Sequence, residues 1–80
     1  MIYGAGVYRQ GKPDGWRDSF VAQEYADGVR FFVTPSHGYL EIDLDKYQAD
    51  LTSYDYKSGH YAYLEEDCNA PKWLKEHNYI

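Results

Sequence analysis

The chain has 80 residues, a net charge of −5, ten tyrosines and one cysteine. This length predicts a single domain over residues 1–80, and the acidic balance argues against direct nucleic-acid binding, which requires a basic patch. A single cysteine excludes an internal disulfide. The sequence has no apolar run near the ~18 residues of a membrane span and no visible signal peptide, so it predicts a cytosolic protein.

The first half of the chain is predicted to form strands joined by tight turns. A glycine-rich start indicates a short edge strand over 2–8, followed by a loop over 11–15. Three further strands are expected over 20–25, 29–34 and 39–43. Asp27-Gly28 separates the first two, and both residues tolerate positive φ, so the pair is a strong hairpin signal. The turn Pro35-Ser36-His37-Gly38 then reverses the chain, giving a three-stranded antiparallel meander.

Alternating residue types in the third of these strands predict a sheet with one solvated face. Leu40 and Ile42 point inward, whereas Tyr39, Glu41 and Asp43 point outward. Such alternation is typical of an antiparallel sheet that is covered on one side only.

The second half is predicted to add helices to the sheet. Leu44, Tyr47 and Leu51 have helical spacing, which predicts a short helix or helical turn over 44–52. A polar, aromatic loop or hairpin over 53–60 and a strand over 60–65 follow. Asn69 as N-cap and Pro71 in the first turn predict a helix to about residue 77. The expected fold is α+β: a small antiparallel sheet of about four or five strands, with the meander at its centre, packed with a C-terminal α-helix and one short helix.

Charge and tyrosine content place a candidate binding surface after the meander. Residues 41–67 carry eight acidic and two basic residues, for a net charge of −6. Opposite fields steer association, so a basic protein partner is favoured. Tyrosine, serine and glycine in residues 53–63 are typical of a binding loop, although an ordinary hairpin with tyrosine pairs has the same composition. The predicted partner-binding residues are Asp43, Asp45, Asp50, Tyr54, Asp55, Tyr56, Tyr61, Tyr63, Glu65, Glu66 and Asp67.

An alternative site combines His37 and His60 with the run of polar residues 65–68, which ends in Cys68. Histidine, carboxylate and thiolate groups can bind a metal or take part in hydrolysis. However, the side chains of Ser36 and His37 are neighbours that point apart in extended chain, and the spacing of zinc motifs is absent. Acidic residues before a helix also complement its dipole. The leading expectation is therefore that no cofactor is bound and no catalytic residue is present.

Two segments resemble an uncharacterised domain family found in phage and plasmid proteins. They are GVRFFVTPSHGYLEI, residues 28–42, and YAYLEEDCNA, residues 61–70. The family marks are a strand ending in Thr-x-x-His-Gly and a later Glu-Glu-Asp-Cys segment that opens a helix; the match covers about residues 15–77. Tyr39 and Asn69 depart from the family, which often has Gly and Asp there. The resemblance implies no known activity, but it implies that His37 and residues 65–68 belong together.

In size and charge the chain also resembles small phage-encoded inhibitors of CRISPR–Cas systems. That likeness implies a non-enzymatic DNA mimic in the host bacterial cytoplasm, as a monomer or homodimer. Its partner would be a Cas protein or a type I, Cascade-like effector complex, whose basic DNA-binding surface it would block. The alternatives are a small hydrolase-like or metal-binding domain that uses His37 with Glu66, Asp67 and Cys68, and a phage interaction module with no defence role.

Overall fold

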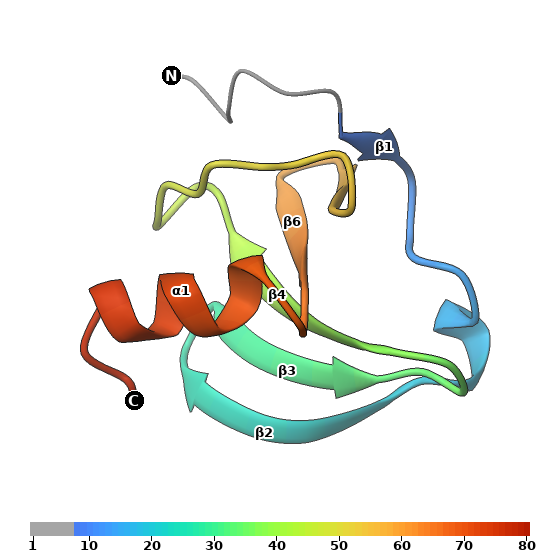
Figure 1. Cartoon of the computed structure of the whole chain (residues 1–80), viewed down its shortest axis with the longest axis horizontal. Helices are drawn as coiled ribbons and strands as arrows, with labels where there is room; N and C mark the ends of the chain where they lie inside the picture. The colour runs from blue at the N-terminus through green and yellow to red at the C-terminus, as the bar shows by residue number, and fades with distance from the viewer. Residues whose placement is uncertain (1–7) are drawn as a thin grey trace.

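A computed structural model of the chain describes residues 8–80 and shows one six-stranded sheet with a single α-helix (Figure 1). In the sheet, the strand order is β1-β5-β6-β4-β3-β2. The elements are β1 (Arg9–Gln10), the 3-10 helix η1 (Trp16–Asp18), β2 (Phe20–Ala26), β3 (Val29–Val33), β4 (Gly38–Asp43), β5 (Tyr56–Ser58), β6 (Tyr61–Glu65) and α1 (Asn69–Glu76).

The predicted α+β class is confirmed, but the sheet differs from the prediction in two ways. It has six strands rather than four or five, and it is mixed, because β1 pairs with β5 in parallel while all other neighbours are antiparallel. The predicted strand over 2–8 falls almost entirely on residues 1–7, which lie outside the described part of the chain.

The meander β2–β3–β4 is confirmed. Gly28 adopts a φ of 94° in the first turn, a conformation that side chains with a Cβ disfavour, and Val29 pairs with Ile42 across the next two strands. The meander forms one half of the sheet and not its centre, because β2 is an edge strand and β4 continues to β6. Local sequence patterns do not predict the pairing of β4 with β6, because β5 and the loop before it lie between these two strands in the sequence.

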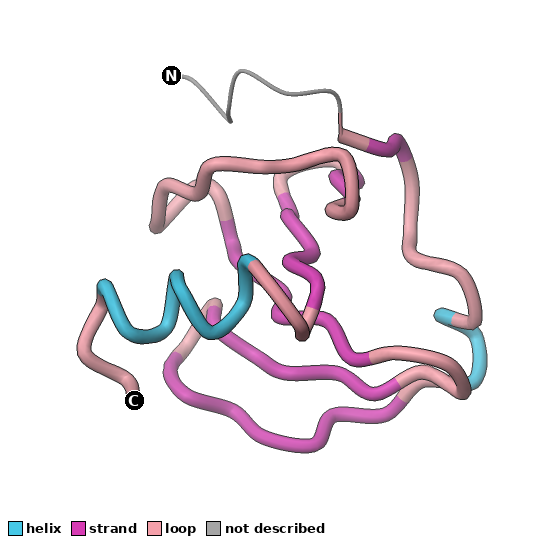
Figure 2. The backbone as a smooth tube through the Cα atoms, in the orientation of Figure 1, coloured by secondary structure: helices cyan, strands magenta, loops and turns pink. Residues whose placement is uncertain are grey.

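One face of the sheet carries the main hydrophobic core. Leu40, Ile42 and Leu64 are fully buried there, and Trp73 and Leu74 of α1 cover them. Figure 1 shows α1 lying across this side of the sheet, and Figure 2 shows the long loop after β4 passing above it. At 25 cal/mol per Å², burying each such side chain contributes about 1.5–3 kcal/mol.

Of the short helix or helical turn predicted over 44–52, the helix is wrong and a single turn is present. Only one turn forms, in which the amides of Lys46 and Tyr47 donate to the Asp43 carbonyl, and the chain is irregular from there to residue 55. The reason is tertiary: the carbonyl of Gln48 accepts the Trp73 indole N–H at 2.8 Å. Backbone groups that find partners on α1 do not need a helix of their own.

The second face of the sheet is also covered, which corrects the expectation of a solvated face. Glu41 and Tyr63 are buried at 4% and 0% exposure. Trp16 packs against Tyr63, with 4.8 Å between the ring centroids, and the Tyr63 hydroxyl donates to the Glu41 carboxylate. Lys12 donates to the Tyr63 hydroxyl at 2.8 Å. The alternation in β4 was read correctly, but the segment that covers the outward side chains lies some 25 residues earlier in the sequence.

Across the described residues, no helix has the length and apolarity needed to cross a membrane.

Candidate functional site

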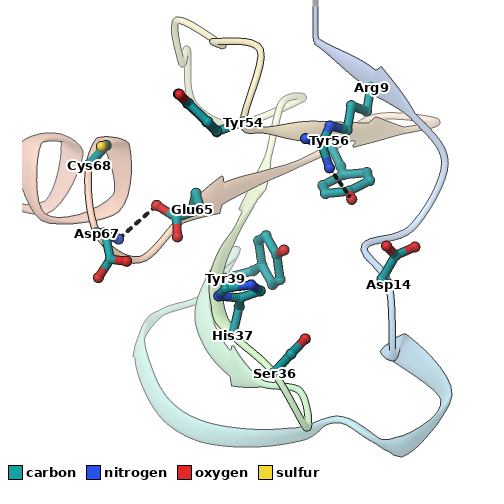
Figure 3. A pocket seen from close by; sticks show the side chains of 10 residues that line it. All are labelled: Arg9, Asp14, Ser36, His37, Tyr39, Tyr54, Tyr56, Glu65, Asp67 and Cys68. Carbon is teal, nitrogen blue, oxygen red and sulfur yellow. Dashed lines mark hydrogen bonds between the residues drawn. The ribbon is translucent and has the colours of Figure 1, made fainter.

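A cleft of about 510 Å³ opens where four separate segments meet (Figure 3). They are the region of β1 and the following loop, the β3–β4 turn, the start of β5, and the β6–α1 junction. The lining residues are Arg9, Asp14, Ser36, His37, Tyr39, Tyr54, Tyr56, Glu65, Asp67 and Cys68.

The β3–β4 turn holds His37 on one wall of the cleft. The Thr34 hydroxyl accepts the His37 amide at 3.0 Å and donates to the His37 carbonyl at 2.9 Å, and the Thr34 amide donates to the same carbonyl. Thr34 is buried, so these bonds fix the turn. The His37 imidazole is exposed and meets the Tyr39 ring edge-on, at 6.4 Å between centroids.

The β6–α1 junction forms the opposite wall. The Glu66 amide donates to the Gly38 carbonyl at 3.1 Å, which ties the junction to the start of β4. The Asp67 amide donates to the Glu65 carboxylate at 2.9 Å. As a result, one donor atom each of His37, Glu65 and Glu66 lie within 4.8 Å of one another. The two sequence segments that carry the family resemblance therefore meet in space.

Tyrosines and one arginine complete the cleft. Arg9 donates to the Tyr56 hydroxyl at 2.8 Å and lies over the Tyr56 ring, and this hydrogen bond raises the pKa of the Arg9 guanidinium. Burial, followed by the nearby Tyr56, raises the pKa of Tyr39. Tyr54 is 61% exposed and contributes a free aromatic face at the rim.

Asp55 lies directly behind the cleft and has a structural role. Its carboxylate is fully buried and accepts four hydrogen bonds: from the Thr52 amide and hydroxyl, the Glu65 amide, and the Asn69 side chain at 2.7 Å. Asn69 was predicted to cap α1, but it is the first helical residue, and its amide group bonds Asp55 and the Asp50 carbonyl. This network joins the loop before β5 to β6 and α1.

The structure separates the predicted partner-binding residues and does not gather them on one surface. Tyr54, Tyr56, Glu65 and Asp67 line the cleft. In contrast, Asp43 and its partner Tyr61 lie at the other end of the β4–β6 pair. Four residues of strand, about 14 Å, separate Asp43 from Tyr39, which pairs with Glu65 at the cleft. Burial removes Asp55 and Tyr63 from any contact surface, and Tyr56, which lines the cleft, is only 6% exposed. The remaining three are Asp45 near Asp43, exposed Asp50 before the loop to β5, and Glu66 beside His37.

The residues of the alternative site are partly brought together. His37 and Cys68 share the cleft, and Cys68 is exposed. His60 lies elsewhere, in a second cluster with Asp43 and Asp45. Ser36 also reaches the cleft, but no hydrogen bond between its hydroxyl and the His37 ring is found within residues 8–80. The structure therefore has no nucleophile–base pair at this turn.

Sequence reasoning missed Arg9, Asp14 and Tyr39. Arg9 reaches the cleft only because β1 pairs in parallel with β5, with Arg9 opposite Tyr56. Asp14 had a local signal, since it lies in the glycine-rich loop that was predicted, but no pattern in the sequence says which surface that loop meets.

Comparison with known proteins finds no protein-family model, curated protein or solved structure that matches this chain. The likeness to the phage and plasmid domain family and to CRISPR inhibitors therefore stays a prediction.

Proposed function

We propose that the protein is a non-enzymatic, phage-encoded inhibitor that binds the basic DNA-binding surface of a Cas effector complex, with a type I, Cascade-like complex as the expected target. Its contact surface would be the rim of the cleft, together with Tyr54, and not the whole of residues 43–67. The carrying observation is the chemistry of this rim: exposed tyrosine beside an excess of carboxylates.

The charges in the cleft favour a cationic partner group. Asp14, Glu65 and Asp67 line it, and Arg9 is its one basic residue within the described part of the chain. Arg9 donates to the neutral Tyr56 hydroxyl and keeps its charge, so three carboxylates against one guanidinium leave the lining with a net charge of −2. An arginine or lysine from a partner would pair with these carboxylates and lie against the Tyr54 ring.

Tyr54 has the properties of an interface anchor. Its side chain is large and exposed, and its backbone is held in place, because the Tyr54 amide donates to the Thr52 hydroxyl and the Thr52 amide donates to the buried Asp55 carboxylate. Tyrosine and arginine are enriched among the residues that dominate binding energy at interfaces. A partner surface that holds DNA is rich in arginine and lysine, which makes it the natural complement of this rim.

The test is binding of purified protein to a Cascade-type complex, with target-DNA binding and cleavage as the readouts. We expect salt-sensitive binding that prevents target binding. Y54A is expected to weaken binding by about 5- to 30-fold, the loss of an anchor worth about 1–2 kcal/mol. D67K is also expected to weaken binding, and its effect should grow as the salt concentration falls, because repulsion between the lysine and the basic partner is least screened at low salt.

D45K is the matched control, since Asp45 is exposed and lies with Asp43 and His60 away from the cleft. It should leave affinity within about threefold of the wild type. Unchanged target cleavage at saturating protein would refute the proposed function. A pull-down from the bacterial host that recovers no Cas subunit would favour an interaction module without a defence role.

A further inference from the structure

We propose that His37, Glu65 and Glu66 form a binding site for one divalent transition-metal ion, of the Zn²⁺ class, at the edge of the cleft, where His37 and Glu65 line it and Glu66 lies just outside its lining. This inference does not rest on the proposed function, because it concerns the purified chain alone. It narrows the candidates from the sequence, which were His37, His60 and residues 65–68, to three ligands and leaves out His60, Asp67 and Cys68.

The donor set suits such an ion. A ring nitrogen of His37 and one carboxylate oxygen each from Glu65 and Glu66 lie within 4.8 Å of one another. In a tetrahedral zinc site, atoms bound to the ion at 2.0–2.2 Å lie about 3.3–3.6 Å apart, so side-chain rotation must bring the three donor atoms closer together by up to about 1.5 Å before they bind one ion. Imidazole together with carboxylates selects Zn²⁺ or Mn²⁺ over Mg²⁺, which is bound by oxygen ligands and water.

The backbone holds the three ligands in place before any ion arrives. His37 lies in the turn fixed by the buried Thr34, and the Glu66 amide is bonded to the Gly38 carbonyl at 3.1 Å. The Glu65 carboxylate also accepts the Asp67 amide at 2.9 Å, which orients it as a second-shell bond orients a metal ligand. A site with a fixed backbone loses less entropy when it binds.

Gly38 provides the space that the Glu66 carboxylate occupies. A Cβ at this position would lie 2.7 Å from Glu66 Oε2 and 2.5 Å from the Phe31 ring. The φ of Gly38 is not in the left-handed region, so backbone conformation does not require glycine here. What requires it is the close approach of the carboxylate and the Phe31 ring.

The ligands are also available. Within residues 8–80, neither the His37 ring nor the Glu66 carboxylate makes a hydrogen bond or ion pair. Two adjacent carboxylates with no cation repel each other, and a bound cation removes that repulsion. Three protein ligands leave a further coordination position for water or a ligand in the cleft, as in open zinc sites.

The second cluster of metal-binding residue types is a weaker candidate. Asp43 there accepts the Asp45 amide at 2.9 Å, as Glu65 accepts the Asp67 amide, but the His60 ring packs closely on Tyr61, at 4.3 Å between ring centroids, whereas 6.4 Å separates His37 from Tyr39. Its His60 therefore supplies a matched control for His37: both are exposed histidines beside two carboxylates.

The test is isothermal titration of tag-free, metal-free protein with Zn²⁺, with Mg²⁺ as the comparison ion. We expect one Zn²⁺ per chain, at least tenfold weaker binding in H37A and in E66Q, and unchanged binding in H60A and C68S. E66Q keeps the shape of the side chain, and circular dichroism confirms that each variant is folded.

Several outcomes would overturn the assignment. These are no Zn²⁺ binding by folded wild-type protein, equal binding of Mg²⁺, loss of binding in H60A in place of H37A, or a tenfold loss in C68S. Cobalt substitution provides a second readout: absorption bands typical of nitrogen and oxygen ligands support the site, whereas a thiolate charge-transfer band contradicts it.

Discussion

Replacing Asp55 by alanine is the sharpest test of how the cleft is built. The carboxylate is fully buried and accepts hydrogen bonds from two groups of Thr52, from the Glu65 amide and from the Asn69 side chain, at 2.7–3.1 Å. These bonds join the loop before β5 to β6 and to the start of α1. D55A removes the acceptor and leaves all four donors behind.

The expected cost follows from these contacts. Removing one partner of a buried, charged hydrogen-bonded group costs about 3–5 kcal/mol, because the remaining groups stay desolvated and unpaired. Proteins are stable by roughly 0.05–0.15 kcal/mol per residue, or about 4–12 kcal/mol for a chain of this length. D55A should therefore remove a large part of the stability. D55N keeps the shape but turns one acceptor into a donor, and should cost about 2 kcal/mol.

Urea unfolding followed by tryptophan fluorescence measures this effect. Trp16 and Trp73 lie on opposite faces of the sheet, so they report on both cores. With a slope of about 1 kcal/mol per molar urea, D55A should lower the midpoint by about 3 M or leave the chain unfolded. D45N, at an exposed aspartate, should stay within about 0.5 kcal/mol of the wild type. A D55A midpoint within about 0.5 M of the wild type would show that the network does not stabilise the fold.

Two further predictions concern the second sheet face and the cleft wall. Burial, followed by the nearby Glu41, raises the pKa of Tyr63, so the unfolded chain ionises first; stability is then full below about pH 10 and falls as pH rises above it. Y63F should lower stability at neutral pH by about 1–2 kcal/mol, through the lost bond to Glu41, and should flatten the alkaline loss in urea titrations between pH 8 and 11. G38A should cost about 1–3 kcal/mol in thermal unfolding, because its Cβ meets the Phe31 ring and the Glu66 carboxylate; a variant as stable as the wild type would contradict the packing described.

Local patterns were sufficient for the meander and the C-terminal helix. Asp27-Gly28 marks a hairpin because the turn needs positive φ, and the alternation over 39–43 sets the faces of β4. Both signals act between residues close in sequence. The helix over 44–52 failed for the opposite reason, since its spacing is helical but its carbonyls are bonded to side chains of α1.

The candidate site was only partly accessible to sequence reasoning. Residue types drew attention to His37 and to residues 65–68, and these segments do meet across the β4–β6 pairing. The same reasoning grouped the buried residues Asp55, Tyr56 and Tyr63 with exposed partner-binding residues. Composition does not distinguish a buried side chain with hydrogen-bond partners, such as the Asp55 carboxylate with its four donors, from a solvated one.

The sequence by itself determined the α+β class, the meander, the acidic character and the residues with reactive side chains. The tertiary structure alone decided which of them are exposed, that β4 pairs with β6, and that the segment around Trp16 covers the second sheet face. The physical reason is range: turns and alternation are set by neighbouring residues, whereas burial and the cleft depend on contacts between segments tens of residues apart.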